Sequence, residues 1–183
     1  QSWATVATIL TAAPATEIYT VVAGTLDGGF DGFGDYVLSV AGVSTSMIKN
    51  GNFSSLETFW QFFATPTPAY IVHSVNNGVL EYYRVPPPAG TANQAVAYQE
   101  TGVSLPDFAP VLAQFDLANT STTRKRISVL ILDADFSDLH VCTFWLEAGA
   151  PMRTYQMKTH TTEVWTNAAL YFYAASAGRN GGV

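Results

Sequence analysis

Charge is scarce in this sequence. Only 12% of its 183 residues are Asp, Glu, Lys or Arg, whereas 48% are hydrophobic, so solubility has to rest on Thr, Ser, Asn and Gln. Fourteen acidic residues against eight Lys and Arg give a net charge of -6. This balance argues against a nucleic-acid partner, because such binding depends on Lys and Arg that neutralise phosphates. The one basic cluster, Arg124-Lys125-Arg126, is short and is predicted to be a solvated strand start.

Cysteine is nearly absent as well. Cys142 stands alone, which excludes an intrachain disulfide and a cysteine-based zinc site, and its apolar surroundings predict a core residue. The sequence also lacks a continuous apolar run of membrane-spanning length. It opens at Gln1 without a Met or a basic leader, which either a removed signal peptide or a trimmed sequence would explain. Together with the sparse charge, this predicts an extracellular or cell-surface location.

Alternation of apolar and polar residues with a period of two runs along most of the chain, whereas helical spacing is rare. In one run, Val111, Ala113, Phe115 and Leu117 are predicted to face one side and the residues between them the other. Similar runs, rich in Val, Ile, Thr, Tyr and Phe, occur at Glu17–Gly24, Tyr36–Val43, Ala69–Val75, Val79–Val85, Gln94–Glu100, Ile127–Leu132, Leu139–Leu146, Thr154–His160 and Val164–Ala174. Turn-forming clusters separate them. About ten short strands predict an all-β protein, an antiparallel β-sandwich or jelly roll.

One segment departs from this pattern. Within residues 54–63, Leu56, Phe59, Trp60 and Phe63 fall near helical spacing, which predicts either a helical turn or an irregular, aromatic-rich loop. Composition also changes near residue 45, where an Ala- and Thr-rich stretch gives way to a denser strand pattern. Residues 1–45 are therefore predicted to be an N-terminal extension with one or two extra strands, and residues 46–183 the sandwich itself.

Two stretches carry a family resemblance. The run "IKNGNFSS", followed by "FW", is similar to the first strand of carbohydrate-binding modules of families 4 and 9, in which Asn-Gly-x-Phe-Glu is followed closely by a Trp. The run "THTTEVWTNAALYFYAASAG" resembles their penultimate strand. The resemblance covers residues 48–183. It implies a galactose-binding-like jelly-roll sandwich, part of a secreted or surface protein, that binds glycans without cleaving them, with Trp60 and Trp165 as packing residues.

The sequence departs from that family in two respects. Ser54 stands where the family has an acidic residue linked to a structural calcium, which puts that ion in question. The family also has a further strand beyond the point that corresponds to Val183. The resemblance therefore predicts a sandwich that lacks one strand.

Sugar binding relies on aromatic rings that stack on sugar faces and on polar groups that hold hydroxyls. The candidate ligand-binding residues are Tyr70, Tyr82, Tyr83, Arg84, Tyr98 and Tyr155. On the predicted strand, Tyr82 and Arg84 share one face, while Glu81 and Tyr83 share the other, so either face offers a ring beside a charge. The competing interpretation is packing, because most aromatic side chains of a sandwich lie in its core.

Asp133, Asp135 and Asp138 lie close together between two apolar runs. Such a group is able to hold Ca²⁺, to supply half of a hydrolase site, or to form the polar tip of a β-hairpin with Asx-turn hydrogen bonds. The spacing matches no standard calcium loop, so the hairpin tip ranks first, calcium second and catalysis last. The glycine-rich stretch with Asp27, Asp31 and Asp35 is a further calcium candidate.

Sequence motifs that are typical of enzymes are missing. The sequence contains no G-x-S-x-G elbow and no H-E-x-x-H motif, and its acids show no pairing on separate strand ends of the kind that glycoside hydrolysis requires. His73, His140 and His160 are scattered singly. The protein is therefore predicted not to be an enzyme.

The N-terminal segment supports an alternative function. A sandwich that lacks a strand exposes an apolar groove and unpaired backbone groups, which a strand from elsewhere is able to fill. The run "ATEIYTVVAG", residues 15–24, alternates well enough to be that strand. Insertion into a neighbouring copy is head-to-tail and builds a filament, whereas insertion into its own domain completes the sandwich in cis. Carbohydrate binding and filament assembly through residues 1–25 both remain open.

Overall fold

Every regular element that the structure describes is a β-strand. The computed structural model describes residues 20–22, 36–39, 46–65, 71–84 and 94–174. The strands are β1 (Thr20–Val22), β2 (Tyr36–Ser39), β3 (Gln61–Thr65), β4 (Ile71–Asn76), β5 (Val79–Arg84), β6 (Gln94–Glu100), β7 (Pro110–Leu117), β8 (Lys125–Asp133), β9 (Leu139–Leu146), β10 (Arg153–His160) and β11 (Ala168–Ala174). The predicted all-β class is confirmed. Across these ranges, no helix has the length and apolarity needed to cross a membrane.

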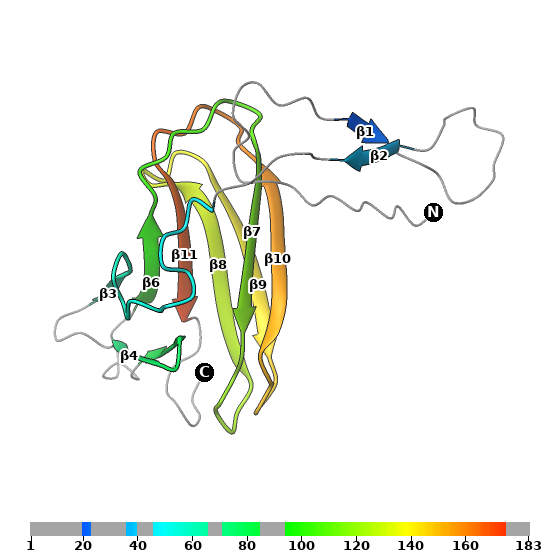
Figure 1. Cartoon of the computed structure of the whole chain (residues 1–183). Coiled ribbons are helices and arrows are strands. Elements are labelled where there is room, and N and C mark those ends of the chain that lie inside the picture. The colour runs from blue at the N-terminus through cyan, green and yellow to red at the C-terminus, as the bar shows by residue number, and fades with distance from the viewer. Residues whose placement is uncertain (1–19, 23–35, 40–45, 66–70, 85–93, 175–183) are drawn as a thin grey trace, which may run out of the picture.

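The larger layer is a five-stranded antiparallel sheet with the order β3-β6-β11-β8-β9 (Figure 1). Its middle is apolar on both sides: in β8, Val129, Leu130, Ile131 and Leu132 are all buried. β8 and β9 form the predicted hairpin, with Leu132 opposite Leu139. We call the side of this sheet that meets the smaller layer its inner face, and the opposite side its outer face.

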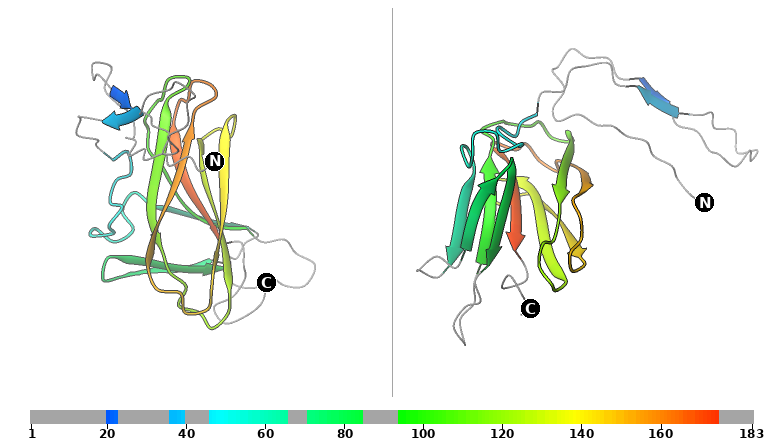
Figure 2. Two further views of the ribbon diagram at one scale, coloured as in Figure 1. Left: turned by 90° about the vertical axis from the view of Figure 1, so that its right-hand side faces the viewer. Right: turned by 60° about the horizontal axis from the view of Figure 1, so that its bottom comes forward.

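The smaller layer consists of β7 and β10, which pair antiparallel from Arg153 opposite Leu117 to His160 opposite Pro110. Both strands lie towards the β8–β9 end of the larger sheet and away from β3 (Figures 1 and 2). The predicted inward set of β7 is confirmed, because Val111, Ala113, Phe115 and Leu117 all belong to or pack against the core between the layers. On its outward side, Gln114 and Asp116 are exposed.

The main core lies between the two layers. Its buried members are Leu105, Val111, Leu117, Val129, Ile131, Leu146, Met157, Trp165, Ala168, Leu170 and Phe172. Trp165 is completely buried, as the sequence predicts. The rings of Phe115 and Phe172 meet edge to face across the layers at 5.3 Å. Each large apolar side chain buried here contributes about 1.5–3 kcal/mol, so this contact between the layers is the main source of stability.

A hairpin and a loop accompany the smaller layer. β4 and β5 pair with each other, and the hydroxyl of Tyr82 on β5 donates to the carbonyl oxygen of Phe172 on β11 at 3.0 Å. The loop 46–60 is held to β6 by Gln99, whose buried side-chain amide accepts from the N–H of Lys49 at 2.7 Å and donates to its carbonyl oxygen at 2.9 Å. No ladder joins β5 to β7 among the described strands. These two strands are therefore not hydrogen-bonded to each other in a sheet.

The aromatic segment near residue 60 is a loop and a strand, with no helical turn. Residues 50–60 follow a series of tight turns, and β3 begins at Gln61, inside the segment that has helical spacing. The side chain of Asn50 explains the outcome: its amide donates to the carbonyl oxygens of Leu56 (2.8 Å) and Thr58 (3.0 Å) and accepts from the N–H of Ser55 (3.0 Å). These bonds use the backbone groups that a helix would pair internally.

Two further expectations need correction. Cys142 is exposed rather than buried, because β9 is an edge strand of the larger sheet. β11 begins at Ala168 and not at Val164, because Trp165 forms an isolated bridge with Leu105 that bends the chain before the strand.

β1 and β2 pair with each other in a separate two-stranded antiparallel sheet, with Thr20 opposite Ser39. Both strands fall within predicted runs of the N-terminal segment. Because β1 lies inside residues 15–24, the strand predicted to fill a sandwich groove pairs here with β2 instead. The acidic candidates Asp27, Asp31 and Asp35 lie outside the described residues.

Candidate functional site

Asp133 ties the β8–β9 hairpin to the loop that precedes β11. It is only 1% exposed, and its carboxylate accepts hydrogen bonds from the backbone N–H groups of Thr166 at 2.8 Å and Asn167 at 2.9 Å. The hydroxyl of Thr166 lies 3.4 Å from both carboxylate oxygens. A buried carboxylate with this set of donors acts as a structural anchor.

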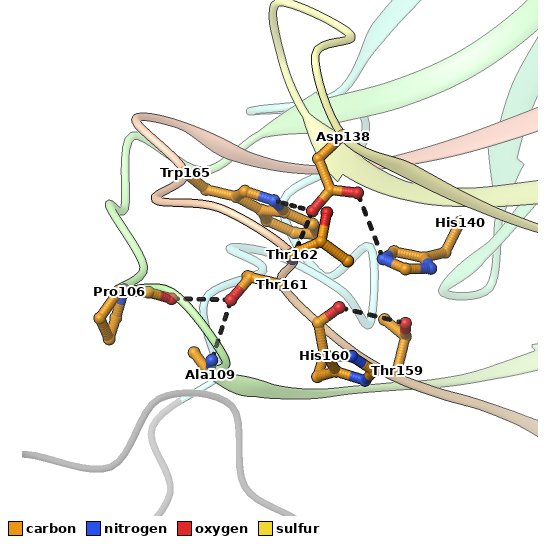
Figure 3. Close-up of polar contacts among 9 residues, drawn as sticks. All are labelled: Pro106, Ala109, Asp138, His140, Thr159, His160, Thr161, Thr162 and Trp165. Atoms are coloured by element: carbon orange, nitrogen blue, oxygen red, sulfur yellow. Dashed lines mark hydrogen bonds and ion pairs between the residues drawn. The ribbon is translucent and has the colours of Figure 1, made fainter.

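Asp138 anchors the same loop at a second point (Figure 3). One carboxylate oxygen accepts from the N–H of Thr162 at 2.7 Å and from the indole N–H of Trp165 at 2.8 Å, and the other lies 3.5 Å from Nε2 of His140. Burial raises the pKa of Asp138, but the hydrogen bonds from Thr162 and Trp165, with His140 nearby, outweigh burial and hold the pKa below its ordinary value. This end of the sandwich therefore favours the ionised carboxylate.

Thr161 completes this end of the sandwich (Figure 3). The residue is fully buried, and its hydroxyl donates to the carbonyl oxygen of Pro106 at 2.7 Å and accepts from the N–H of Ala109 at 2.9 Å. Its backbone N–H donates to the carbonyl oxygen of Ala109 at 3.0 Å. The segment that enters β7 is thus joined to the end of β10, and the contacts drawn in Figure 3 form a structural cap.

Asp135 differs from the other two acids because it is exposed at the hairpin tip. It accepts from the N–H of Ser137 at 2.9 Å, the Asx-turn bond expected of a hairpin tip, and this bond lowers the pKa of Asp135. The three carboxylates therefore serve three different sets of N–H donors. Within the described ranges, no three His, Cys, Asp or Glu side chains come together as metal ligands. Calcium at this hairpin stays a prediction, which a chelator-reversible rise in melting temperature would support.

The candidate tyrosines lie in separate environments. Tyr82 and Tyr155 pack against the main core, and burial strongly raises the pKa of Tyr82. Tyr155 also meets the ring of Phe144 edge to face at 5.2 Å. Tyr98 lies on the outer face, where its hydroxyl donates to the side chain of Gln61 at 3.0 Å. These three residues do not share a site.

Tyr83 lines a groove that occupies the gap between β5 and β7. The groove has a volume of about 880 Å³, and we call it the β5–β7 groove. Arg84, half-buried, ends the same strand, and Tyr70 lies outside the described residues. Of the six predicted ligand contacts, Tyr82 and Tyr83 are among the residues that line the groove.

The β5–β7 groove has two strands as its walls and the inner face of the larger sheet as its floor. Leu170 and Phe172 of β11 lie in the floor, and Ile48 and Trp60 of the loop 46–60 flank one end. Phe115, half-buried on β7, adds a further ring to the lining. The floor is therefore apolar and continuous with the main core.

Polar side chains stand along the walls of the groove. Glu81 lies on β5, and Gln114 and Thr120 lie on β7 and the turn after it. The hydroxyl of Thr120 donates to the carboxylate of Glu81 at 3.4 Å, which links the two walls. Gln114 also accepts from the side chain of Gln156 at 2.9 Å. An apolar floor with hydrogen-bonding groups on the walls is the general form of a ligand site.

Sequence reasoning did not single out Trp60, Phe115 or Gln114 as groove residues. Alternation along β7 does predict that Phe115 faces inwards and Gln114 outwards. It does not predict that, among the described strands, β7 pairs with β10 alone, because strand order depends on contacts between distant segments. The alternation of residues therefore indicates which side chains of β7 face inwards, but it does not locate the groove.

Comparison with known proteins gives a weak structural likeness. No family model matches the chain, and no curated protein matches its sequence. Among solved structures, the enzymatically active domain of tailspike protein 4 from bacteriophage CBA120 aligns with a TM-score of 0.49 and 18% sequence identity. The alignment covers 69% of this chain and 19% of that one. A likeness this weak supports no statement about function.

The two hairpin acids Asp133 and Asp135 provide a matched pair for a stability test. Asp133→Ala leaves the part-buried N–H donors of Thr166 and Asn167 without their acceptor and is expected to lower the free energy of unfolding by about 2–4 kcal/mol. Asp135→Ala removes only an exposed turn bond, so its cost should stay below about 1 kcal/mol. Urea denaturation of both variants measures the difference. Equal losses would show that Asp133 does not anchor the loop.

The lowered pKa of Asp138 predicts a dependence of stability on pH. A carboxyl group with a folded pKa below its unfolded one stabilises the protein above the unfolded pKa, about 4, and this contribution is lost as pH falls through the folded pKa. Asp138→Asn keeps an acceptor for Thr162 and Trp165 but cannot titrate. Melting temperatures measured from pH 7 down to pH 2.5 should therefore fall less steeply in the variant than in the parent chain. Parallel curves would contradict the assigned role.

Proposed function

We propose that this chain is a carbohydrate-binding β-sandwich module and that an extended glycan lies in the β5–β7 groove. The observation that carries the proposal is the combination, in one groove of about 880 Å³, of aromatic rings with hydrogen-bonding groups on both walls. This volume falls within the usual range of ligand sites. The β7 wall has eight residues, about 27 Å at 3.4 Å per residue, which gives room for several sugar rings in a row.

Each wall has a role in this proposal. Tyr83 and Phe115 offer apolar contact to the faces of the sugar rings, which carry aliphatic C–H groups. The Glu81 carboxylate accepts hydrogen bonds from the sugar hydroxyl groups that project sideways, and the Gln114 amide accepts from them or donates to them. Because the groove is lined without a strongly positive surface, neutral glycans suit it better than highly phosphorylated ones.

The proposed activity is binding without cleavage. Hydrolysis of a glycosidic bond needs two carboxyl groups that face each other across the bond. Glu81 and Asp116 both line the groove, but the carboxylate of Asp116 accepts from the hydroxyl of Thr154 at 2.6 Å and that of Glu81 from the hydroxyl of Thr120 at 3.4 Å, so each is held by its own neighbour. A module of this kind acts outside the cell, where polysaccharides are displayed, as the sparse charge of the sequence also indicates.

Affinity electrophoresis on soluble β-glucan, xylan, mannan and a bacterial O-polysaccharide, followed by calorimetry on any hit, tests the proposal. Tyr83→Ala is expected to weaken binding roughly tenfold, because it removes one stacking contact. Phe108→Ala is the matched control, since Phe108 is 73% exposed and does not line the groove. No retardation on any polysaccharide would count against the module function, and release of reducing ends would contradict binding without cleavage.

A second candidate function uses the same groove to accept a β-strand. The specific observation is that β7 pairs on one side with β10 alone and that β5 pairs on one side with β4 alone among the described strands. Antiparallel pairing directs only alternate backbone groups to one neighbour, so the remaining groups of β7 point towards the gap. An added strand would complete the smaller layer and fill the groove between β5 and β7.

Residues 15–24 of a neighbouring copy are the proposed donor, and their transfer requires β1 to leave β2. The chain then assembles head-to-tail into a filament. Negative-stain microscopy at high protein concentration should show fibres, and deletion of residues 1–25 should abolish them. A monomer by light scattering at the same concentration would contradict strand exchange. A soluble oligosaccharide that binds the groove should compete with fibre formation, which separates the two uses of the groove.

A further inference from the structure

The outer face of the larger sheet is apolar, although the described strands place no second layer on it. A buried cluster of Val96, Leu130, Leu132, Ala169 and Tyr171 forms its centre. Large apolar side chains on and beside this face are markedly exposed: Phe63 46%, Phe136 46%, Leu139 42%, Val141 50% and Trp145 47%. At about 200 Å² for each full side chain, these five expose roughly 450 Å². A contiguous patch of this size on a single protein often marks a binding surface.

The aromatic rings of this face stand against one another. Tyr98 and Tyr171 stack at 4.6 Å, and Tyr171 and Tyr173 at 6.3 Å, while Phe136 meets Tyr171 edge to face at 5.6 Å. With Phe63 they surround a depression of about 240 Å³. Since the faces of the stacked rings are occupied by one another, they offer little to a sugar ring. The depression is instead suited to an apolar side chain of a protein partner.

Strand register places the charged residues of this face at its margins. One row of side chains across the strands consists of Glu100, Ala169, Leu132 and Leu139. A second, parallel row contains Arg126 and Trp145, and it lies six residues away from the first along β8. The two rows between them contain only uncharged residues: Gln61, Tyr98, Tyr171, Leu130 and Val141 in one, and Phe63, Val96, Tyr173, Ser128 and Thr143 in the other. Glu100 and Arg126 therefore lie at diagonally opposite corners of an uncharged field.

The basic corner is broader than one residue. The guanidinium groups of Arg124 and Arg126 lie over the ring of Trp145, at 4.4 Å and 5.4 Å from its centroid, and Arg124 also pairs with Glu147 at 2.9 Å. At the acidic corner, Glu100 accepts from Asn167 at 3.3 Å and from the hydroxyl of Tyr171 at 3.4 Å. The face thus has an apolar centre and a polar margin, the usual anatomy of a protein–protein interface.

We propose that the outer face binds the outer face of a second copy of this chain about a two-fold axis. The two-fold axis lies in the plane of the interface, runs across the strands and passes midway between the two corners. Rotation about it places the Glu100 corner of one copy on the Arg126 corner of the other. Glu100 of each copy then meets Arg126 of the other, so the attraction occurs twice. The same axis passes near Phe63 and Val141, which brings each of them close to its own symmetry mate.

Charge complementarity favours a second copy over other occupants. Two chains that each carry a net charge of -6 repel one another over most of their surfaces, and this face is the place where opposite corners compensate. The patch of roughly 450 Å² and its polar margin together approach the ~800 Å² per partner of a standard interface. An anionic membrane or an acidic polymer would be attracted at the Arg126 corner but repelled at the Glu100 corner, whereas a second copy is matched at both.

Sedimentation velocity of the full 183-residue chain over a range of concentrations tests the proposal. Glu100→Arg and Arg126→Glu should each weaken dimerisation about tenfold, because two opposite-charge contacts become two like-charge contacts. The double variant restores opposite charges in both places and should recover most of the parent affinity. Val141→Asp should weaken the dimer on the order of a hundredfold by burying two carboxylates near the axis.

Val72→Asp is the matched control, because Val72 is 44% exposed on β4, away from this face, and should leave the dimer unchanged. Circular dichroism tests whether each variant is folded. If Val141→Asp does not fold, the Glu100 and Arg126 variants still test the proposed dimer. A parent chain that stays monomeric to about 1 mM, or a double variant no better than the singles, overturns the proposal. So does a monomer that binds vesicles or polysaccharide through this face. Dimers that persist after deletion of residues 1–25 distinguish this interface from strand exchange.

Discussion

The contact between a five-stranded sheet and a two-stranded one controls the rest of this structure. Two strands cannot cover five, so the main core is complete only where β7 and β10 lie over β8, β9 and β11. The remaining part of the inner face is closed by the loop 46–60 and the β4–β5 hairpin, which are fastened by individual contacts such as Gln99 to Lys49 and Tyr82 to Phe172. The β5–β7 groove lies where these two kinds of cover meet.

The second constraint is that β8 and β11 are apolar on both sides. A strand with one wet face alternates between apolar and polar residues, whereas a strand covered on both faces reads as a continuous apolar run. Val129 to Leu132 is such a run, and all four side chains are buried. On the outer face this burial depends on neighbouring rings such as Tyr171 and Tyr98 and on the hairpin tip through Phe136. The aromatic rings of the outer face are themselves partly exposed, which favours their burial under a further layer of protein.

Local pattern predicted the strands well but could not predict how they are arranged. β6 and β9 match their predicted bounds, since Gln94–Glu100 and Leu139–Leu146 alternate clearly between turns. β3 was missed because Asn50 reorganises the preceding loop through its side chain, an effect that spacing does not contain. Tyr82 and Tyr83 are neighbours of one type and both line the groove, yet Tyr82 packs against the main core and its hydroxyl donates to the carbonyl oxygen of Phe172. Only the packing of β5 on β11 separates them.

The groove and the outer face lie on opposite sides of one sheet, so occupation of one leaves the other free. A two-fold dimer through the outer faces would carry two β5–β7 grooves that point away from each other. Two grooves on one particle bind a polymer with repeating units more tightly than one, because the second contact forms at high effective concentration. Weak contact at each groove is then sufficient for firm attachment to a polysaccharide surface. Strand insertion would abolish this advantage, since a strand that fills the groove leaves no room for a sugar chain, and the two proposed uses of the groove are therefore exclusive within one subunit.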